Sequence, residues 1–115
     1  MILGSNGENI YPEEIEALIN EKDFVSESLV MQYKGKLIAR VHLNIELVED
    51  HYKHLKSNAI EFQEQVAKRS DEMLEELLVY VNEHVAKNSK LQMVLLQAQP
   101  FEKTPTLKIK RYLYN

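Results

Sequence analysis

Hydrophobic residues recur in the first half of the chain with two different periods. Apolar positions spaced by three and four predict an amphipathic helix that begins at Pro12 and ends near residues 20–22. Between residues 28–34 and 37–45 the period changes to two, which is typical of strands with one buried face. Gly35 lies between these two segments and can take the positive φ of a tight turn, so we expect a β-hairpin.

The second half of the chain predicts a long helical stretch and one further strand. Residues 58–87 carry apolar side chains at helical spacing, as one helix or as two helices joined at Ser70-Asp71, where either residue could cap a helix start. Residues 48–57 are polar and irregular. Residues 91–96 form a short apolar run, which we place as a central strand buried on both faces.

The two ends of the chain complete the predicted fold. Residues 1–10 predict a loop or short hairpin, because Gly4-Ser5-Asn6-Gly7 is a turn cluster flanked by small apolar patches. A polar loop follows Pro100, and an apolar and aromatic segment closes the chain. We therefore expect one α+β domain over residues 1–115, with a small, mostly antiparallel sheet of about three main strands plus the N-terminal hairpin, packed with helices.

Composition narrows the class of protein. With 44% hydrophobic and 28% charged residues, the 115-residue chain resembles an average globular domain, and its apolar runs are shorter than the roughly 20 residues that a transmembrane helix needs. The N-terminus lacks the pattern of a secretory signal, and the absence of cysteine excludes disulfides and thiolate metal sites. We expect a cytoplasmic protein without a transmembrane segment.

Charge is distributed unevenly along the chain. The net charge of −4 argues against nucleic acid as a partner, since such proteins carry a broad basic face. Residues 8–27 are strongly acidic, with one lysine, whereas residues 102–111 carry four cations and one glutamate. The C-terminal segment is therefore where we expect an anionic ligand to bind.

Three features could carry chemistry, and each also has an ordinary structural explanation. Gly7 precedes a helix start, where a missing side chain permits close approach of a ligand, yet such a glycine is usually part of a turn. Lys108 and Lys110 would lie on opposite sides of an extended segment, so only one could serve a given site, and basic tails are commonly solvated. His51 and His54 have helical spacing, but no third ligand accompanies them and we expect no metal site.

Two sequence segments resemble the boundary motifs of the C-terminal domain of the adenylate-forming (AMP-binding, acyl-CoA synthetase) superfamily. The first is Gly7-Glu8-Asn9-Ile10-Tyr11-Pro12-Glu13-Glu14-Ile15-Glu16, which is similar to the segment that opens this mobile lid domain. The second is Lys103-Thr104-Pro105-Thr106-Leu107-Lys108-Ile109-Lys110-Arg111, which resembles the closing motif. Most members of the superfamily have glycine at the position of Leu107. A closing motif with a bulky residue at this position is similar to that of the long-chain fatty-acid CoA ligases.

The resemblance implies a role for the chain in a two-step reaction. A fatty acid and ATP would give an acyl-adenylate and pyrophosphate with Mg²⁺. The lid would then change orientation, and the CoA thiol would displace AMP to give the thioester. Lys108 matches the adenylation lysine, and Gly7 and Glu8 match the loop that lines the pantetheine passage. Lys110 and Arg111 receive no firm role from the resemblance, and residues 46–64 match no part of the family pattern.

The family's remaining parts are not recognisable in this chain. The N-terminal adenylating domain, with the sites for ATP, Mg²⁺ and fatty acid, would be the main partner, and the hinge would fall before Met1. We therefore expect the fragment alone to be inactive and to bind no cofactor tightly. Two alternatives stay open: a lid that serves a carrier protein instead of CoA, and a non-catalytic α+β interaction module. Peripheral membrane association of the parent enzyme stays open as well.

Overall fold

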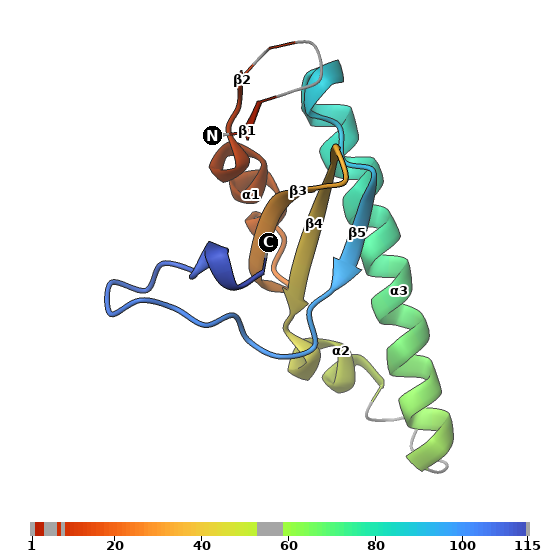
Figure 1. Ribbon diagram of the computed structural model, residues 1–115. Helices are drawn as coiled ribbons and strands as arrows, with labels where there is room; N and C mark the ends of the chain where they lie inside the picture. The colour runs from red at the N-terminus through yellow and green to blue at the C-terminus, as the bar shows by residue number, and fades with distance from the viewer. Residues whose placement is uncertain (1, 4–6, 8, 53–58, 115) are drawn as a thin grey trace.

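The apolar stripes of the sequence meet in a core between two helices and a three-stranded sheet (Figure 1). The computed structural model describes residues 2–3, 7, 9–52 and 59–114, without the side chains of residues 51 and 52. In chain order the elements are β1 (Ile2–Leu3), β2 (Asn9–Ile10), α1 (Pro12–Asn20), β3 (Val25–Tyr33), β4 (Lys36–Leu43), α2 (Ile45–Tyr52), α3 (Ala59–His84), a 3₁₀ turn (Lys87–Ser89), β5 (Met93–Leu96) and a second 3₁₀ turn (Arg111–Leu113). This arrangement confirms the predicted α+β class.

The sheet has the order β3-β4-β5 and combines both kinds of pairing. Strands β3 and β4 form the predicted antiparallel hairpin, and their turn places Lys34 and Gly35 at φ 49° and 75°. Two successive positive φ values are those of the turn that matches the natural twist of a hairpin. Strand β5 pairs with β4 in parallel, with Ile38 opposite Met93. The sheet is therefore mixed, with the antiparallel pair as its longer part.

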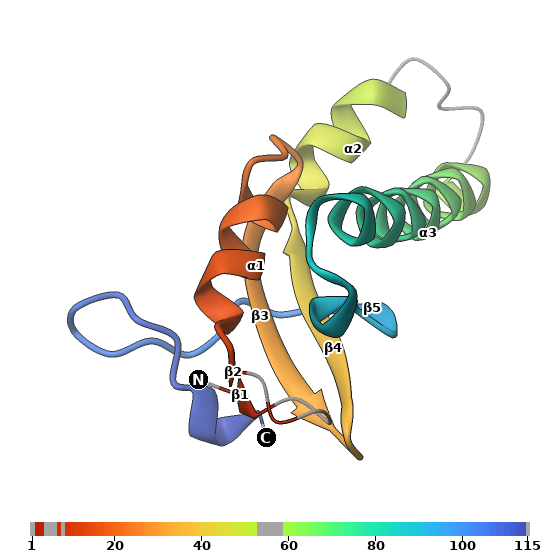
Figure 2. The ribbon, with the colours of Figure 1, turned by 90° about the horizontal axis from the view of Figure 1, so that it is seen from above.

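Each face of the sheet is covered by a different part of the chain. Helices α1 and α3 cover one face and bury the main core, which consists of Ile10, Ile15, Ile19, Val30, Leu37, Ala39, Val41, Leu43, Leu74, Leu77, Val81 and Leu91. On the other face, Phe101 packs on Leu29, Met31 and Ile38, and Tyr114 packs edge-on against Phe101 with 5.0 Å between the ring centroids. The residues after β5 are thus fixed to the sheet by apolar contacts, which positions the closing segment (Figure 2).

The predicted hairpin at the N-terminus is confirmed in its strands. β1 and β2 pair in antiparallel register, with Ile2 opposite Ile10 and Leu3 opposite Asn9. Residues 4–6 and Glu8 lie outside the part of the chain that the structure describes. The hairpin leads directly into α1, whose first residue is Pro12, as predicted.

Other predictions need correction. Residues 91–96 do not form a central strand: β5 lies at the edge of the sheet, and Met93, Leu95 and Leu96 are exposed. The segment 48–57 is not wholly irregular, because α2 reaches Tyr52. The long helix is continuous through Ser70, whose hydroxyl donates to the Val66 carbonyl at 2.9 Å and therefore does not cap a new helix.

Candidate functional site

The closing segment folds into a loop held by backbone hydrogen bonds across its base. Lys103 and Ile109 face each other in an antiparallel bridge, and the Thr104 amide donates to the Lys108 carbonyl at 2.8 Å. The Leu107 amide donates to the Thr104 carbonyl at 2.9 Å, which closes a four-residue turn. Lys108 therefore follows a tight turn and is not part of a regular strand. Because the segment around Lys108 is not a regular strand, strand geometry does not place Lys108 and Lys110 on opposite sides of it.

The residue types of this turn suit its geometry. Pro105 stands at the second position, where a fixed φ is favourable, and the Thr104 hydroxyl accepts from the Lys108 amide at 3.2 Å. Leu107 has φ 65°, a left-handed conformation that costs a residue with a side chain about 1–2 kcal/mol relative to glycine. The side chain of Leu107 is exposed, so packing offsets little of this cost. Glycine would adopt this backbone conformation without that cost.

The four cations of the closing segment divide into two classes. Lys103 pairs with Glu27 at 2.8 Å, and Arg111 pairs with Glu16 at 2.6 Å. Lys108 is exposed, and neither it nor Lys110 forms an ion pair with any residue that the structure describes. The acidic segment near the N-terminus therefore neutralises half of the predicted anion-binding charge inside the domain. The Lys108 ammonium is free to act on a group outside it.

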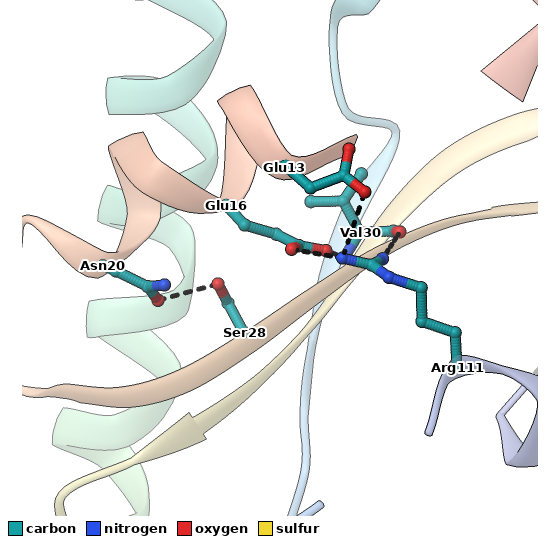
Figure 3. Close-up of polar contacts among 6 residues, drawn as sticks. All are labelled: Glu13, Glu16, Asn20, Ser28, Val30 and Arg111. Atoms are coloured by element: carbon teal, nitrogen blue, oxygen red, sulfur yellow. Dashed lines mark hydrogen bonds and ion pairs between the residues drawn. The ribbon is translucent and has the colours of Figure 1, made fainter. Parts of the chain in front are cut away.

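Arg111 joins three elements through a fork of contacts (Figure 3). Its Nη2 donates to Glu16 Oε1 on α1, and its Nη1 donates to the Val30 carbonyl on β3 at 3.4 Å. The second oxygen of Glu16 accepts the Val30 amide at 2.7 Å. Glu13 lies 3.8 Å from the guanidinium at a more exposed position. The hydrogen bond to Glu16 raises the pKa of Arg111 above its usual value, although partial burial opposes the shift.

The sequence does not predict the pairing of Arg111 with Glu16, although the position of Glu16 on α1 indicates that its carboxylate needs a partner. Glu16 lies between Ile15 and Ile19 in the sequence, and therefore beside the apolar stripe of the helix. In the structure the residue is only 8% exposed. A carboxylate at such a position needs a cation or several hydrogen-bond donors. The sequence could not indicate which cation would supply them, because Arg111 is 95 residues away along the chain.

A groove of about 900 Å³ lies beside this contact, bounded by the closing segment, α1 and β3. Its lining contains both signs of charge: the cations are Lys103, Lys108, Lys110 and Arg111, and the carboxylates are Glu13, Glu16 and Glu27. Two of these cations are already paired with carboxylates of the lining, and the negative charge of the carboxylates opposes the binding of a bare polyanion. The arrangement therefore suits an ammonium that reaches towards a partner surface better than it suits an anion site within the domain.

The other predicted site residues lie elsewhere. Gly7 has φ 82°, and a Cβ built on it would meet no atom within 4 Å. The β1–β2 hairpin that frames Gly7 and the loop that carries Lys108 occupy different regions of the surface (Figures 1 and 2). The hairpin and the loop are thus separate parts of the fold, and Glu8 lies outside the described residues.

His54 and the side chain of His51 lie outside the described part of the chain, which holds no cluster of three His, Cys, Asp or Glu side chains suited to a metal. Within residues 2–3, 7, 9–52 and 59–114, no helix is long and apolar enough to cross a membrane.

Solved structures resemble this chain over nearly its whole length. A fatty acyl CoA synthetase from Mycobacterium tuberculosis is 23% identical, with a TM-score of 0.61, over 98% of this chain and 18% of its own. A benzoate CoA ligase from Burkholderia xenovorans LB400 is 22% identical, with a TM-score of 0.61, over 92% of this chain and 18% of its own. The chain has the fold of the C-terminal domain of acyl-CoA synthetases. It spans about a fifth of the length of these enzymes.

Other comparisons define how far this likeness extends. The O-succinylbenzoate CoA synthetase of Bacillus subtilis is 20% identical, with a TM-score of 0.61, over 96% of this chain and 18% of its own. The fold is thus shared by synthetases named for aliphatic and aromatic acids, and it does not select among them. No family model and no curated protein matches the sequence.

Proposed function

We propose that this chain is the mobile lid of an AMP-forming long-chain fatty-acid CoA ligase, and that it works with an N-terminal adenylating domain. ATP, Mg²⁺ and the fatty acid would bind to that domain, and CoA would reach it along the lid. The observation that carries the proposal is Lys108: an exposed lysine without an ion pair to any described residue, on a loop braced at its base, within the C-terminal synthetase fold.

Lys108 would act in the first half-reaction. As the substrate carboxylate meets the α-phosphate of ATP, negative charge concentrates between them, and a positioned ammonium stabilises that charge more in the transition state than in the ground state. An ammonium already paired with a carboxylate would contribute less, because its charge would be offset. The exposure of Lys108 and the turn before it are what this role requires.

Gly7 would act in the second half-reaction, in the other orientation of the lid. Its region is separate from that of Lys108, which fits a lid that presents two faces in turn. Since no atom of the described domain lies near the missing Cβ, any narrowing around Gly7 would come from the adenylating domain. A passage formed in that way would admit the thin pantetheine arm of CoA and exclude a side chain at this position.

The acyl class rests on a narrower argument. Leu107 has a left-handed backbone, which favours glycine, yet the position carries a bulky residue. In this respect the closing motif resembles the long-chain branch of the superfamily. A long-chain acid is therefore the substrate we propose. Comparison of palmitate with benzoate as the acid in the complete ligase would test this assignment directly.

The two half-reactions provide the test of function. In the complete ligase, Lys108→Ala should lower pyrophosphate release from ATP and palmitate by about 100-fold or more, since it removes a transition-state charge contact. Thioester formation from palmitoyl-adenylate and CoA should survive. Lys110→Ala is the matched control, because it removes a neighbouring ammonium that also lacks an ion pair to any described residue, and it should leave adenylation nearly unchanged.

Gly7→Asn should give the opposite result. Asparagine tolerates a left-handed backbone, so this variant adds a side chain without forcing a new conformation. We expect thioester formation to fall and adenylation to persist. The proposal would be rejected if Lys108→Ala left both half-reactions intact, and the interaction-module alternative would then take its place. If a carrier protein replaced CoA as the acceptor, adenylation would proceed and free CoA would give no thioester.

A further inference from the structure

The structure places the two motif segments in direct contact through Arg111, which pairs with Glu16 at 2.6 Å and with Glu13 at 3.8 Å, although the segments stand at opposite ends of the sequence. Glu16 ends the first segment, Arg111 ends the second, and Val30 on β3 lies between them (Figure 3). We propose that Glu16 and Arg111 are positioning residues, which together form a clamp that aims Lys108 for the adenylation half-reaction. This inference rests on the proposed function of Lys108.

The clamp lies at the edge of the sheet, where the backbone groups of Val30 on β3 have no neighbouring strand to pair with among the described residues. β3 is an edge strand, and the amide and carbonyl of Val30 both bond to side chains: the amide to Glu16 and the carbonyl to Arg111. Buried backbone groups of this kind must find partners. Arg111 therefore cannot leave without exposing Glu16 and the Val30 carbonyl, and this fixes the C-terminal end of the loop to the sheet.

The distance along the chain from the clamp to the loop is short. Lys108 precedes Arg111 by three residues, and the intervening Lys110 amide donates to the Glu102 carbonyl at 2.8 Å. The loop has a second anchor at its other end, where Lys103 pairs with Glu27. With both ends held, the direction of Lys108 is set by the body of the lid, so a rotation of the lid carries the ammonium with it.

Two weaker explanations fit the contacts less well. In a solvated surface pair both side chains would be largely exposed. Here the side chain of Glu16 is 10% exposed and that of Arg111 is 35% exposed. A CoA-phosphate contact would require Arg111 to leave Glu16, which would then keep an unpaired charge at a nearly buried position. The geometry thus assigns Arg111 to a contact within the lid.

The experiment uses the complete ligase with Arg111→Gln, and it takes Arg69→Gln as the matched control. Arg69 also binds two glutamates, at 3.2 and 3.1 Å, and its side chain is 31% exposed, but it stands on α3 away from the closing loop. Arg111→Gln should lower pyrophosphate release by about 10- to 100-fold, the scale of a misplaced catalytic group. Thioester formation from palmitoyl-adenylate and the behaviour of Arg69→Gln should both stay close to those of the unmodified ligase.

Two further variants separate positioning from simple support of the fold. When Lys108 is already alanine, Arg111→Gln should cause no additional loss of adenylation, because there is no ammonium left to aim. Arg111→Lys should recover part of the activity, since lysine can pair with Glu16 but cannot fork to Val30 as well. An equal loss in both half-reactions would overturn the inference and leave Arg111 with a purely structural role.

The outcomes also distinguish this inference from the proposed function itself. If Lys108→Ala abolishes adenylation while Arg111→Gln does not affect it, the lysine assignment stands and the clamp inference fails. If Lys108→Ala has no effect, the proposed function fails, and the clamp inference fails with it.

Discussion

Replacement of Glu16 by alanine offers a quantitative test of the contacts around Val30. Glu16 accepts the buried Val30 amide, and hydrogen bonds to charged groups contribute about 1.5–3 kcal/mol. Its pair with Arg111 adds about 1 kcal/mol or less, because the guanidinium side chain is 35% exposed and water screens it. Alanine recovers a few tenths through helix propensity, so we expect a loss of about 3 kcal/mol in the free energy of unfolding.

The neighbouring Glu13 supplies an internal control on the same helix and the same guanidinium. It lies 3.8 Å from Arg111 and its side chain is 65% exposed, so Glu13→Ala should change stability by about 0.5 kcal/mol or less. Urea unfolding followed by circular dichroism measures both variants, and the melting temperature of Glu16→Ala should fall by about 12 °C. Equal losses for the two variants would refute the reasoning, because the burial of one carboxylate would then have no energetic consequence.

Two further predictions concern local conformation and titration. Leu107→Gly should raise the free energy of unfolding by at most about 1 kcal/mol, because relief of the positive φ exceeds the added entropy of the unfolded chain. Leu107→Val should lower the free energy of unfolding. A loss of stability with glycine would contradict the left-handed backbone at this position. The hydrogen bond from Tyr80 to Glu21 raises the pKa of Tyr80, so the stability that it contributes is present below the usual tyrosine pKa and is lost as pH rises through the raised value. Site-resolved NMR titration should show Glu21→Gln returning the pKa of Tyr80 towards normal, and an unchanged pKa would exclude this hydrogen bond.

Much of the fold could be predicted because local patterns reflect burial directly. The period of two in residues 37–45 specified the face of β4 that meets the helices, and Pro12 marked the start of α1. The prediction of a central strand at residues 91–96 was wrong, because an apolar run does not indicate how many neighbouring strands it will have. Among the strands that the structure describes, β5 pairs with β4 alone, and three of its apolar side chains stay exposed.

The candidate site was predictable in part for a similar reason. Its two motif segments could be read from the sequence, since each is a continuous stretch of residues. Charge composition overestimated the free cations of the tail, because it does not show which lysines and arginines the domain neutralises for itself. Lys103 and Arg111 find Glu27 and Glu16 only when the tail packs on the sheet.

From the sequence alone one could predict α1, most of α3, the hairpin of β3 and β4, and the resemblance that connects the two ends of the chain. These features depend on spacing and on residue type, which are local properties. Only the tertiary structure decided that Arg111 bridges Glu16 and Val30 and that Lys108 forms no ion pair with a described residue. The physical reason is that the energy of a charge depends on which other charges lie within a few ångströms, and packing alone brings residues so distant in sequence together.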